Sequence, residues 1–149
     1  MRAFWLDGHE AIDAAIDDAR LRAEGVHHER LSIGAHDAPL EALMRANGYL
    51  ERDEIALRPT TEGLEAICAK FDREHAHDED EVRFVLEGEG IFDIRSKDDR
   101  WMRVVVGEGD LIVVPKDRHH RFLLTDARTI RCVRLFQDRK GWVPHYRDA

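Results

Sequence analysis

The sequence has no cluster of basic residues. Its 149 residues include 23 Lys and Arg against 31 Asp and Glu, which gives a formal net charge of −8 with the histidines neutral. Nucleic acids and anionic membrane surfaces attract proteins through clustered Lys and Arg, so this chain carries the wrong sign of charge for either partner. We therefore expect neither nucleic acid nor a membrane as a partner.

Long hydrophobic runs are absent as well. The longest apolar stretches, such as Leu111–Val114, fall far short of the ~20 residues that a membrane-spanning helix needs. Near the N-terminus, Asp7 interrupts the chain before the apolar region of a secretory signal could form. We therefore expect a cytoplasmic protein.

Cysteine is scarce. Cys68 and Cys132 are the only two, they lack CxxC spacing, and both lie among apolar residues. Buried reduced thiols are the favoured interpretation, and a disulfide between them is the alternative. Reduced thiols agree with a cytoplasmic location.

The remaining composition is typical of a globular domain. Hydrophobic residues make up 43% of the chain and charged residues 36%, and no repeat or linker divides it. At a typical ~150 residues per domain, the sequence predicts a single domain over residues 1–149, which we expect to be monomeric.

The first part of the chain, to about residue 73, has the period of helices. The pattern predicts three helices, over Glu10–Glu24, Pro39–Asn47 and Leu64–Phe71. In the first, apolar residues from Ile12 to Ala19 recur at i, i+3, i+4 and i+7, and Gly25 supplies a stop. A threonine at position 60 or 61 can cap the third helix.

The second part, about residues 74–143, changes to short runs with a period of two. It predicts strands at Val82–Leu86, Ile91–Ile94, Trp101–Val106, Leu111–Val114, Phe122–Leu124 and Ile130–Phe136. Turn residues such as those of Glu87–Gly90 separate them, at the spacing of small barrels and sandwiches. The sequence therefore predicts a mainly β fold, a β-barrel with the N-terminal helices packed outside.

The stretch with candidate functional residues begins just before the first of these predicted strands. In an extended chain His75, His77 and Glu81 have the same parity and share a face, whereas in a helix the two histidines would point about 200° apart. Two imidazoles and a carboxylate on one face form a ligand set for a divalent first-row metal such as Fe, Ni, Mn or Zn. An HxH pair is common by chance, and an acidic run such as Asp78–Glu81 is usually solvated.

A fourth ligand is expected from the hairpin downstream, and this hairpin raises the case for a metal. After Gly109 and Asp110, a buried strand ends at Pro115, and a histidine follows on the returning strand. His119 and His120 are both candidates. Parity groups His120 with the inward apolar residues of that strand, but a shift of one residue would reverse the choice.

The other histidines and the tryptophans are given ordinary interpretations. The histidines among polar residues or near the termini are interpreted as surface or loop residues: His9, His27, His28, His36 and His145. Trp5, Trp101 and Trp142 are interpreted as packing residues.

Four segments together resemble the acireductone dioxygenases of the cupin superfamily. They are Glu74-His75-x-His77-x-x-x-Glu81-x-Arg83-Phe84, Gly88-x-Gly90-x-Phe92, Gly109-Asp110-Leu111-Ile112-x-x-Pro115-x-x-x-x-His120, and Arg134-Leu135-Phe136 followed by Gly141-Trp142-Val143. The resemblance is strong from about residue 71 to residue 143 and weaker from residue 25 to residue 57.

The resemblance implies a cupin β-barrel with one Fe(2+) or Ni(2+) per chain. The family's three histidines and one glutamate fall on His75, His77, His120 and Glu81, which selects His120 over His119. The implied activity belongs to methionine salvage, where 1,2-dihydroxy-3-keto-5-methylthiopentene reacts with O2. The Fe form would give 4-methylthio-2-oxobutanoate and formate, and the Ni form methylthiopropionate, formate and carbon monoxide.

The resemblance also implies supporting residues. Arg83 and Arg134 match family arginines and are expected to stabilise the anionic substrate, although Arg134 could equally serve in an ion pair. Glu74 and Asp80 occupy positions that the family links to metal incorporation and to the relay of local changes.

One departure concerns the hairpin, where Lys116-Asp117-Arg118 stands in place of the family's Ala-Gly after the proline. The alternatives are a non-catalytic cupin that binds a metal or small ligand, and a cupin dioxygenase or isomerase for another substrate.

Overall fold

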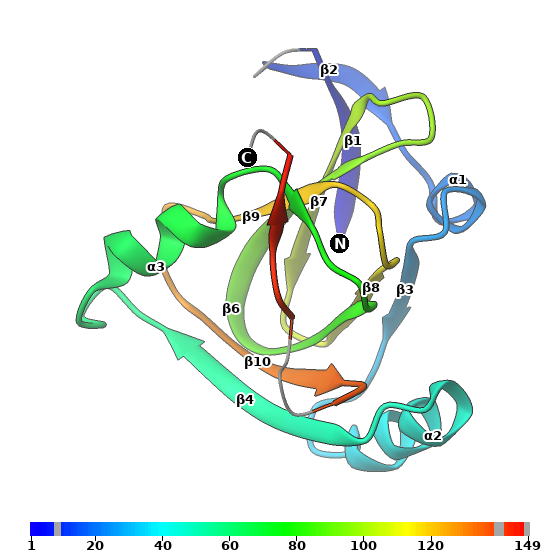
Figure 1. Cartoon of the computed structure of the whole chain (residues 1–149), viewed down its shortest axis with the longest axis vertical. Helices are drawn as coiled ribbons and strands as arrows, with labels where there is room; N and C mark the ends of the chain where they lie inside the picture. The colour runs from blue at the N-terminus through cyan, green and yellow to red at the C-terminus, as the bar shows by residue number, and fades with distance from the viewer. Residues whose placement is uncertain (8–9, 139–141, 148–149) are drawn as a thin grey trace.

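The computed structural model describes residues 1–7, 10–138 and 142–147 of the chain. The strands are β1 (Arg2–Asp7), β2 (Glu10–Ala15), β3 (His27–Arg30), β4 (Glu51–Leu57), β5 (His75–Ala76), β6 (Glu81–Arg95), β7 (Trp101–Gly107), β8 (Asp110–Val114), β9 (His120–Leu124), β10 (Ile130–Phe136) and β11 (His145–Tyr146). The helices are α1 (Asp18–Ala23), α2 (Asp37–Asn47) and α3 (Leu64–Phe71). The mainly β, barrel-like fold expected from the sequence is confirmed (Figure 1).

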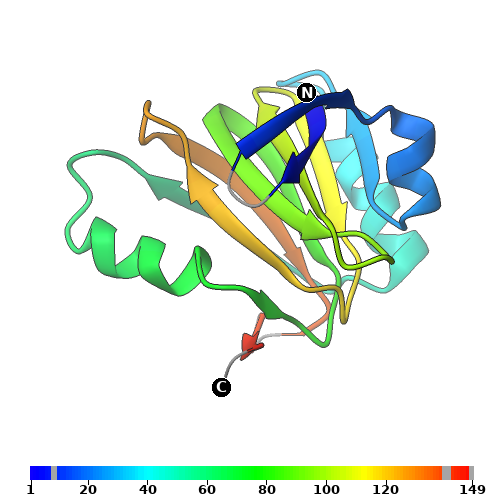
Figure 2. The same ribbon diagram turned by 90° about the horizontal axis from the view of Figure 1, so that it is seen from above.

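The long strand β6 organises the barrel because it belongs to two sheets. Its first half lies between β8 and β10, and its second half lies between β7 and β9, all antiparallel. The first sheet continues outward to β3 and β4, and the second to β5 and β11 on one side and β1 and β2 on the other. Figure 2 shows α1 and α2 at one side of the strands and α3 at the other.

Alternation along the strands creates two apolar cores. The barrel interior is filled by residues such as Phe92, Met102, Val104 and Phe122. A second core lies between α2 and the sheet of β6, β8 and β10, where Leu40 packs near Leu111 and Val133. Both faces of β8 are therefore covered, which explains its continuous apolar run.

The helical prediction for the first part of the chain was wrong over Glu10–Ala15. These residues form β2, which pairs with β1, and only Asp18–Ala23 is helical. Pairing with a neighbouring strand overrides the local period of this segment. Strands β3 and β4 were also missed because their side chains are mostly exposed and polar, so no apolar alternation marks them.

The helices α2 and α3 were predicted, and their ends differ in detail. The α2 helix begins two residues earlier than expected, at Asp37. Gly63, rather than a threonine, caps α3, and the Thr61 hydroxyl instead accepts the backbone N–H of Arg58 at 2.8 Å. None of the helices in the described part of the chain is long and apolar enough to cross a membrane.

The expected turn at Glu87–Gly90 is part of β6. Gly88 has a φ of 76°, a left-handed conformation that suits glycine, and it lies beside an irregularity in the pairing with β10. The two predicted strands on either side are therefore one bent strand. Both cysteines are unpaired thiols; Cys132 is buried as predicted, whereas Cys68 is only half-buried.

Candidate metal centre and its cavity

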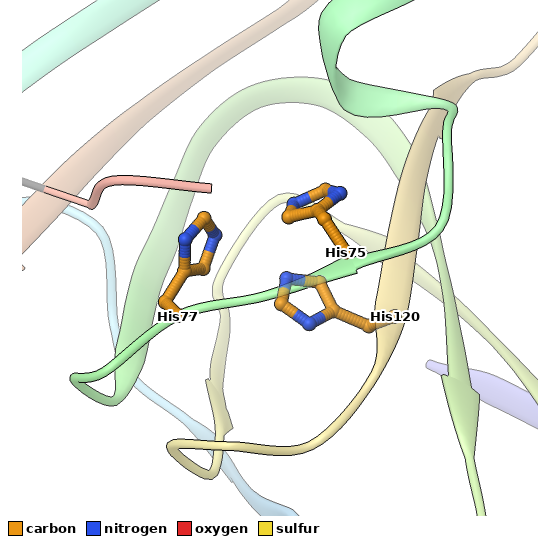
Figure 3. Close-up of side chains that lie close together, drawn as sticks. All are labelled: His75, His77 and His120. Atoms are coloured by element: carbon orange, nitrogen blue, oxygen red, sulfur yellow. The ribbon is translucent and has the colours of Figure 1, made fainter. Parts of the chain in front are cut away.

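Three histidines from two distant segments of the chain lie together inside the barrel. Figure 3 shows the rings of His75, His77 and His120 facing one another. Their ring centroids are 4.6 to 5.1 Å apart, and one nitrogen from each lies within 4.8 Å of the others. All three side chains are buried. This is the only such group of potential metal ligands in the described residues.

Strand pairing brings these histidines together. His75 of β5 lies directly opposite His120 of β9, and β9 in turn pairs with the second half of β6. The hairpin between β8 and β9 is tied to the same edge, because the N–H of Asp117 donates to the carbonyl of His77 at 2.8 Å. His119 is half-buried and is not part of the cluster.

The backbone fixes how each imidazole presents its nitrogens. The Nδ1 atoms of His75, His77 and His120 lie 2.6, 3.1 and 2.9 Å from the carbonyl oxygens of Arg73, Val143 and Arg118, respectively. A carbonyl oxygen can only accept, so each Nδ1 carries a proton, and Nε2 is the nitrogen of each ring that remains to bind a metal. A hydrogen bond of this kind is what orients a metal-binding histidine.

Glu81, at the start of β6, contacts one histidine of the group. Its Oε2 lies 2.7 Å from Nε2 of His120, yet neither atom makes a hydrogen bond with any residue that the structure describes. Two buried lone pairs at that separation repel each other unless they share a proton or a cation. Two ligand atoms that lie ~2.1 Å from an octahedral ion and at right angles to each other are about 3 Å apart, which is close to the observed separation. The residues therefore fit a divalent metal held by three imidazoles and one carboxylate.

Electrostatics keep these groups in the forms that bind a metal. Burial lowers the pKa of His75 to about 4 and also lowers the pKa of His77. Burial alone would raise the pKa of Glu81, but the positive charge of the nearby Arg83 holds it well below its usual value. Neutral imidazoles beside an ionised carboxylate are the protonation states that metal binding requires.

Arg83 is a buried cation behind the site. Its Nε and Nη2 donate to Oε1 of Glu81 at 3.2 and 3.0 Å, and Nη1 contacts the sulfur of Cys132 at 3.6 Å. Burial would lower the pKa of Arg83, but the charge of Glu81 raises it. Four aromatic rings lie 5.0 to 5.9 Å from its guanidinium carbon, namely Phe71, Phe92, Phe122 and Trp142.

A cavity of about 410 Å³ opens beside the cluster, and His77 and Glu81 form part of its wall. Three aromatic side chains, Phe71, Phe136 and Trp142, supply its apolar wall, and Arg134 is one of its charged residues. The indole Nε1 of Trp142 is buried and has no hydrogen-bond partner among the described residues. The cavity thus joins the histidine cluster, an apolar surface and polar donors, which is the usual make-up of a small-molecule site.

Comparison with known proteins agrees with this geometry. A model described as the ARD/ARD′ family matches residues 6–144. The acireductone dioxygenase of Heterostelium pallidum is 37% identical over 144 residues, which cover 97% of this chain and 96% of that protein. The acireductone dioxygenase of Dictyostelium discoideum is 48% identical over 106 residues, 71% of this chain and 72% of that protein. The chain belongs to the ARD/ARD′ family.

A solved structure extends the comparison to the metal. An acireductone dioxygenase from Bacillus anthracis, with a cadmium ion in its active centre, superposes with a TM-score of 0.89 at 29% identity, covering 97% of both chains. A member of the family thus holds a divalent ion in its active centre, which supports a metal cofactor for the histidine cluster described above.

The two acidic residues that the family resemblance marked have distinct contacts. Glu74, next to His75, accepts hydrogen bonds from Arg95 at 3.1 Å and from Arg147 at 2.7 Å. Asp80, next to Glu81, accepts the hydroxyl of Tyr49 at 2.8 Å and the backbone N–H of Lys116 at 2.9 Å. Each acid therefore ties a segment carrying candidate ligands to another part of the fold.

The hairpin at Lys116–Arg118, where the sequence departs from the resemblance, contains a residue in the left-handed conformation. Asp117, which stands at the glycine position, has a φ of 63°, and aspartate tolerates this left-handed conformation better than most residues. Arg118 of the same loop donates to the carbonyl of Arg95 at 3.1 Å. The loop thus has a left-handed residue that aspartate tolerates, and a hydrogen bond ties it to β6.

Several other residues differ from their sequence interpretation or were missed. His28 is not a loop residue: it lies in β3, and its Nε2 is 2.9 Å from buried Asp110. Asp53, in the unpredicted strand β4, pairs with Arg134 at the cavity. Trp142 packs against Phe136 as expected but also lines the cavity. His9 lies outside the described residues.

Proposed function

We propose that this protein is an acireductone dioxygenase of methionine salvage, which cleaves 1,2-dihydroxy-3-keto-5-methylthiopentene with O2. The observation that carries the proposal is the cluster of three buried histidines, with the Glu81 carboxylate against His120, beside a cavity that Arg134 and aromatic side chains help to line. The named relatives support the same reaction class.

We assign His75, His77, His120 and Glu81 as the residues that hold one Fe(2+) or Ni(2+). When bound, such an ion would act as a Lewis acid to which the oxygens of an enediolate could bind. The backbone carbonyls at Nδ1 keep the three rings oriented for this task.

Two arginines near the site, Arg83 and Arg134, can stabilise an anionic, oxygen-rich substrate. Arg83 behind Glu81 and Arg134 at the cavity place positive charge near the position of the enediolate, and opposite charge favours its ionised form. The unpartnered indole N–H of Trp142 can donate to a substrate oxygen, which would satisfy a buried donor. The aromatic wall suits the apolar methylthio tail.

The deciding experiment loads the metal-free protein anaerobically with Fe(2+) or Ni(2+) and supplies the acireductone and O2. We expect oxygen uptake with both metals, carbon monoxide from the Ni form only, and 4-methylthio-2-oxobutanoate from the Fe form. The His77→Ala variant should lose both metal and activity. No oxygen uptake by metal-loaded wild type would refute the function and would favour a non-catalytic cupin, whereas identical products from both forms would refute the dependence on the metal.

A further inference from the structure

The cavity arginine Arg134 is held by a carboxylate from a neighbouring strand. Asp53 of β4 lies directly opposite Arg134 of β10, so the two side chains share a face of the sheet. The pair is bidentate: Nε donates to Oδ1 at 2.8 Å and Nη2 donates to Oδ2 at 2.7 Å. Both residues line the cavity beside the histidine cluster.

The residue on the opposite neighbouring strand explains why Arg134 needs a carboxylate partner. On its other side, Arg134 lies directly opposite Arg83 of β6, and like charges in that position repel. Arg83 is neutralised by Glu81, which is committed to the metal centre. Asp53 is the separate anion that neutralises Arg134.

The pairing also determines which donors of Arg134 remain available. The fork uses Nε and Nη2, and no described residue accepts a hydrogen bond from Nη1. The guanidinium carbon lies 5.0 Å from the centre of the Phe136 ring and 5.5 Å from the centre of the Trp142 ring. An arginine side chain has many rotamers, so a carboxylate fork with flanking rings fixes a group that would otherwise move.

We propose that Asp53 is a positioning residue that holds the Arg134 guanidinium in place, with its Nη1 donors available to an oxyanion of the substrate in the cavity. This inference rests on the proposed function, because the oxyanion is that of the enediolate. Asp53 also repels an anionic substrate, but it lies at the half-exposed edge of the cavity, where solvent screens its charge. The ordering of Arg134 is therefore the larger effect, and removal of Asp53 weakens substrate binding.

The test compares Asp53→Ala with a matched control on the same two strands. Glu54 also pairs with an arginine of β10, at 3.2 Å from Nη1 of Arg131, but alternation places it on the opposite face from Asp53. For Asp53→Ala we expect full metal content, a KM for the acireductone about tenfold higher and a kcat within about twofold of wild type. Binding of the acireductone to the metal-loaded protein without O2 should weaken by a similar factor. Glu54→Ala should change neither value.

A double variant separates positioning from general damage. In an Arg134→Met background, Asp53→Ala should cause no further loss of affinity, because the group that it positions is gone. Asp53→Glu, which keeps the charge and can still reach Arg134, should restore part of the affinity.

The outcomes also distinguish this inference from the function on which it rests. Inactive metal-loaded wild type would refute the proposed function. Active wild type with an unchanged or lower KM in Asp53→Ala would refute the role of Asp53. Equal losses from Asp53→Ala with and without Arg134 would show that Asp53 does not act through that arginine.

Discussion

The buried pair of Arg83 and Glu81 makes the stability of this protein depend on metal in a testable way. The Arg83 side chain is 1% exposed and that of Glu81 4%, and two N–H groups of Arg83 donate to one oxygen of Glu81. Replacing Arg83 by Met removes the cation while leaving an apolar chain of similar length. The carboxylate of Glu81 then stays buried without its main counter-charge.

The expected magnitude depends on whether the centre holds a metal. Removing one partner of a buried ion pair typically costs about 3 to 5 kcal/mol, because the remaining charge is uncompensated. A domain of this size is stable by only about 5 to 15 kcal/mol, so metal-free Arg83→Met should be markedly destabilised. A bound divalent cation would neutralise Glu81 directly. We therefore expect the cost of the substitution to fall by at least about 1 to 2 kcal/mol in the metal-loaded protein.

The assay is denaturant unfolding of wild type and Arg83→Met, each measured metal-free and metal-loaded. Arg103→Met is the matched control, because Arg103 forms a bidentate pair with buried Asp93 on the outer face of the barrel and Asp93 keeps a second partner in Arg121. Its cost should be smaller and should not depend on metal. The reasoning is refuted if Arg83→Met costs the same free energy of unfolding with and without metal.

Three further predictions concern the ligands, an acid far from them and a glycine. Metal analysis after desalting should show loss of the ion from His120→Ala and retention by His119→Ala; the reverse result would mean that the register of the β8–β9 hairpin is shifted. Burial would raise the pKa of Asp110, but hydrogen bonds from His28 and the N–H of Gly107 lower it to about 2, from an ordinary value of 3.8. Because the folded value is the lower one, the charge of Asp110 stabilises the protein above about pH 4, and this contribution is lost as the pH falls through about 2. Asp110→Asn should thus lose about 2 kcal/mol of unfolding free energy near neutral pH, and its difference from wild type should shrink in acid. A difference in unfolding free energy that stays constant with pH would contradict this prediction. Gly88→Ala should destabilise the folded protein by at least about 2 kcal/mol in the same unfolding assay, because Gly88 has a positive φ and a Cβ there would collide with the carbonyl of Thr129. An unchanged unfolding midpoint would contradict this prediction.

Features that depend on local alternation could be predicted from the amino-acid sequence. The period of two around β6 places Glu81 and Arg83 on the inner face, and the structure shows both there with the histidines. The helices α2 and α3 carry their own apolar stripes, so their existence follows from the chain alone. These predictions needed only the geometry of neighbouring residues.

Features that depend on which strands pair, and in what register, could not be predicted, because distant parts of the chain fix them. The polar edge strand β4 has no local signal, and it became a strand because β10 supplies its hydrogen bonds. The pair of Asp53 and Arg134 follows from that register across 81 positions of sequence. The choice of His120 over His119 likewise depends on the register between β9 and β5, because a shift of one residue turns a side chain to the opposite face.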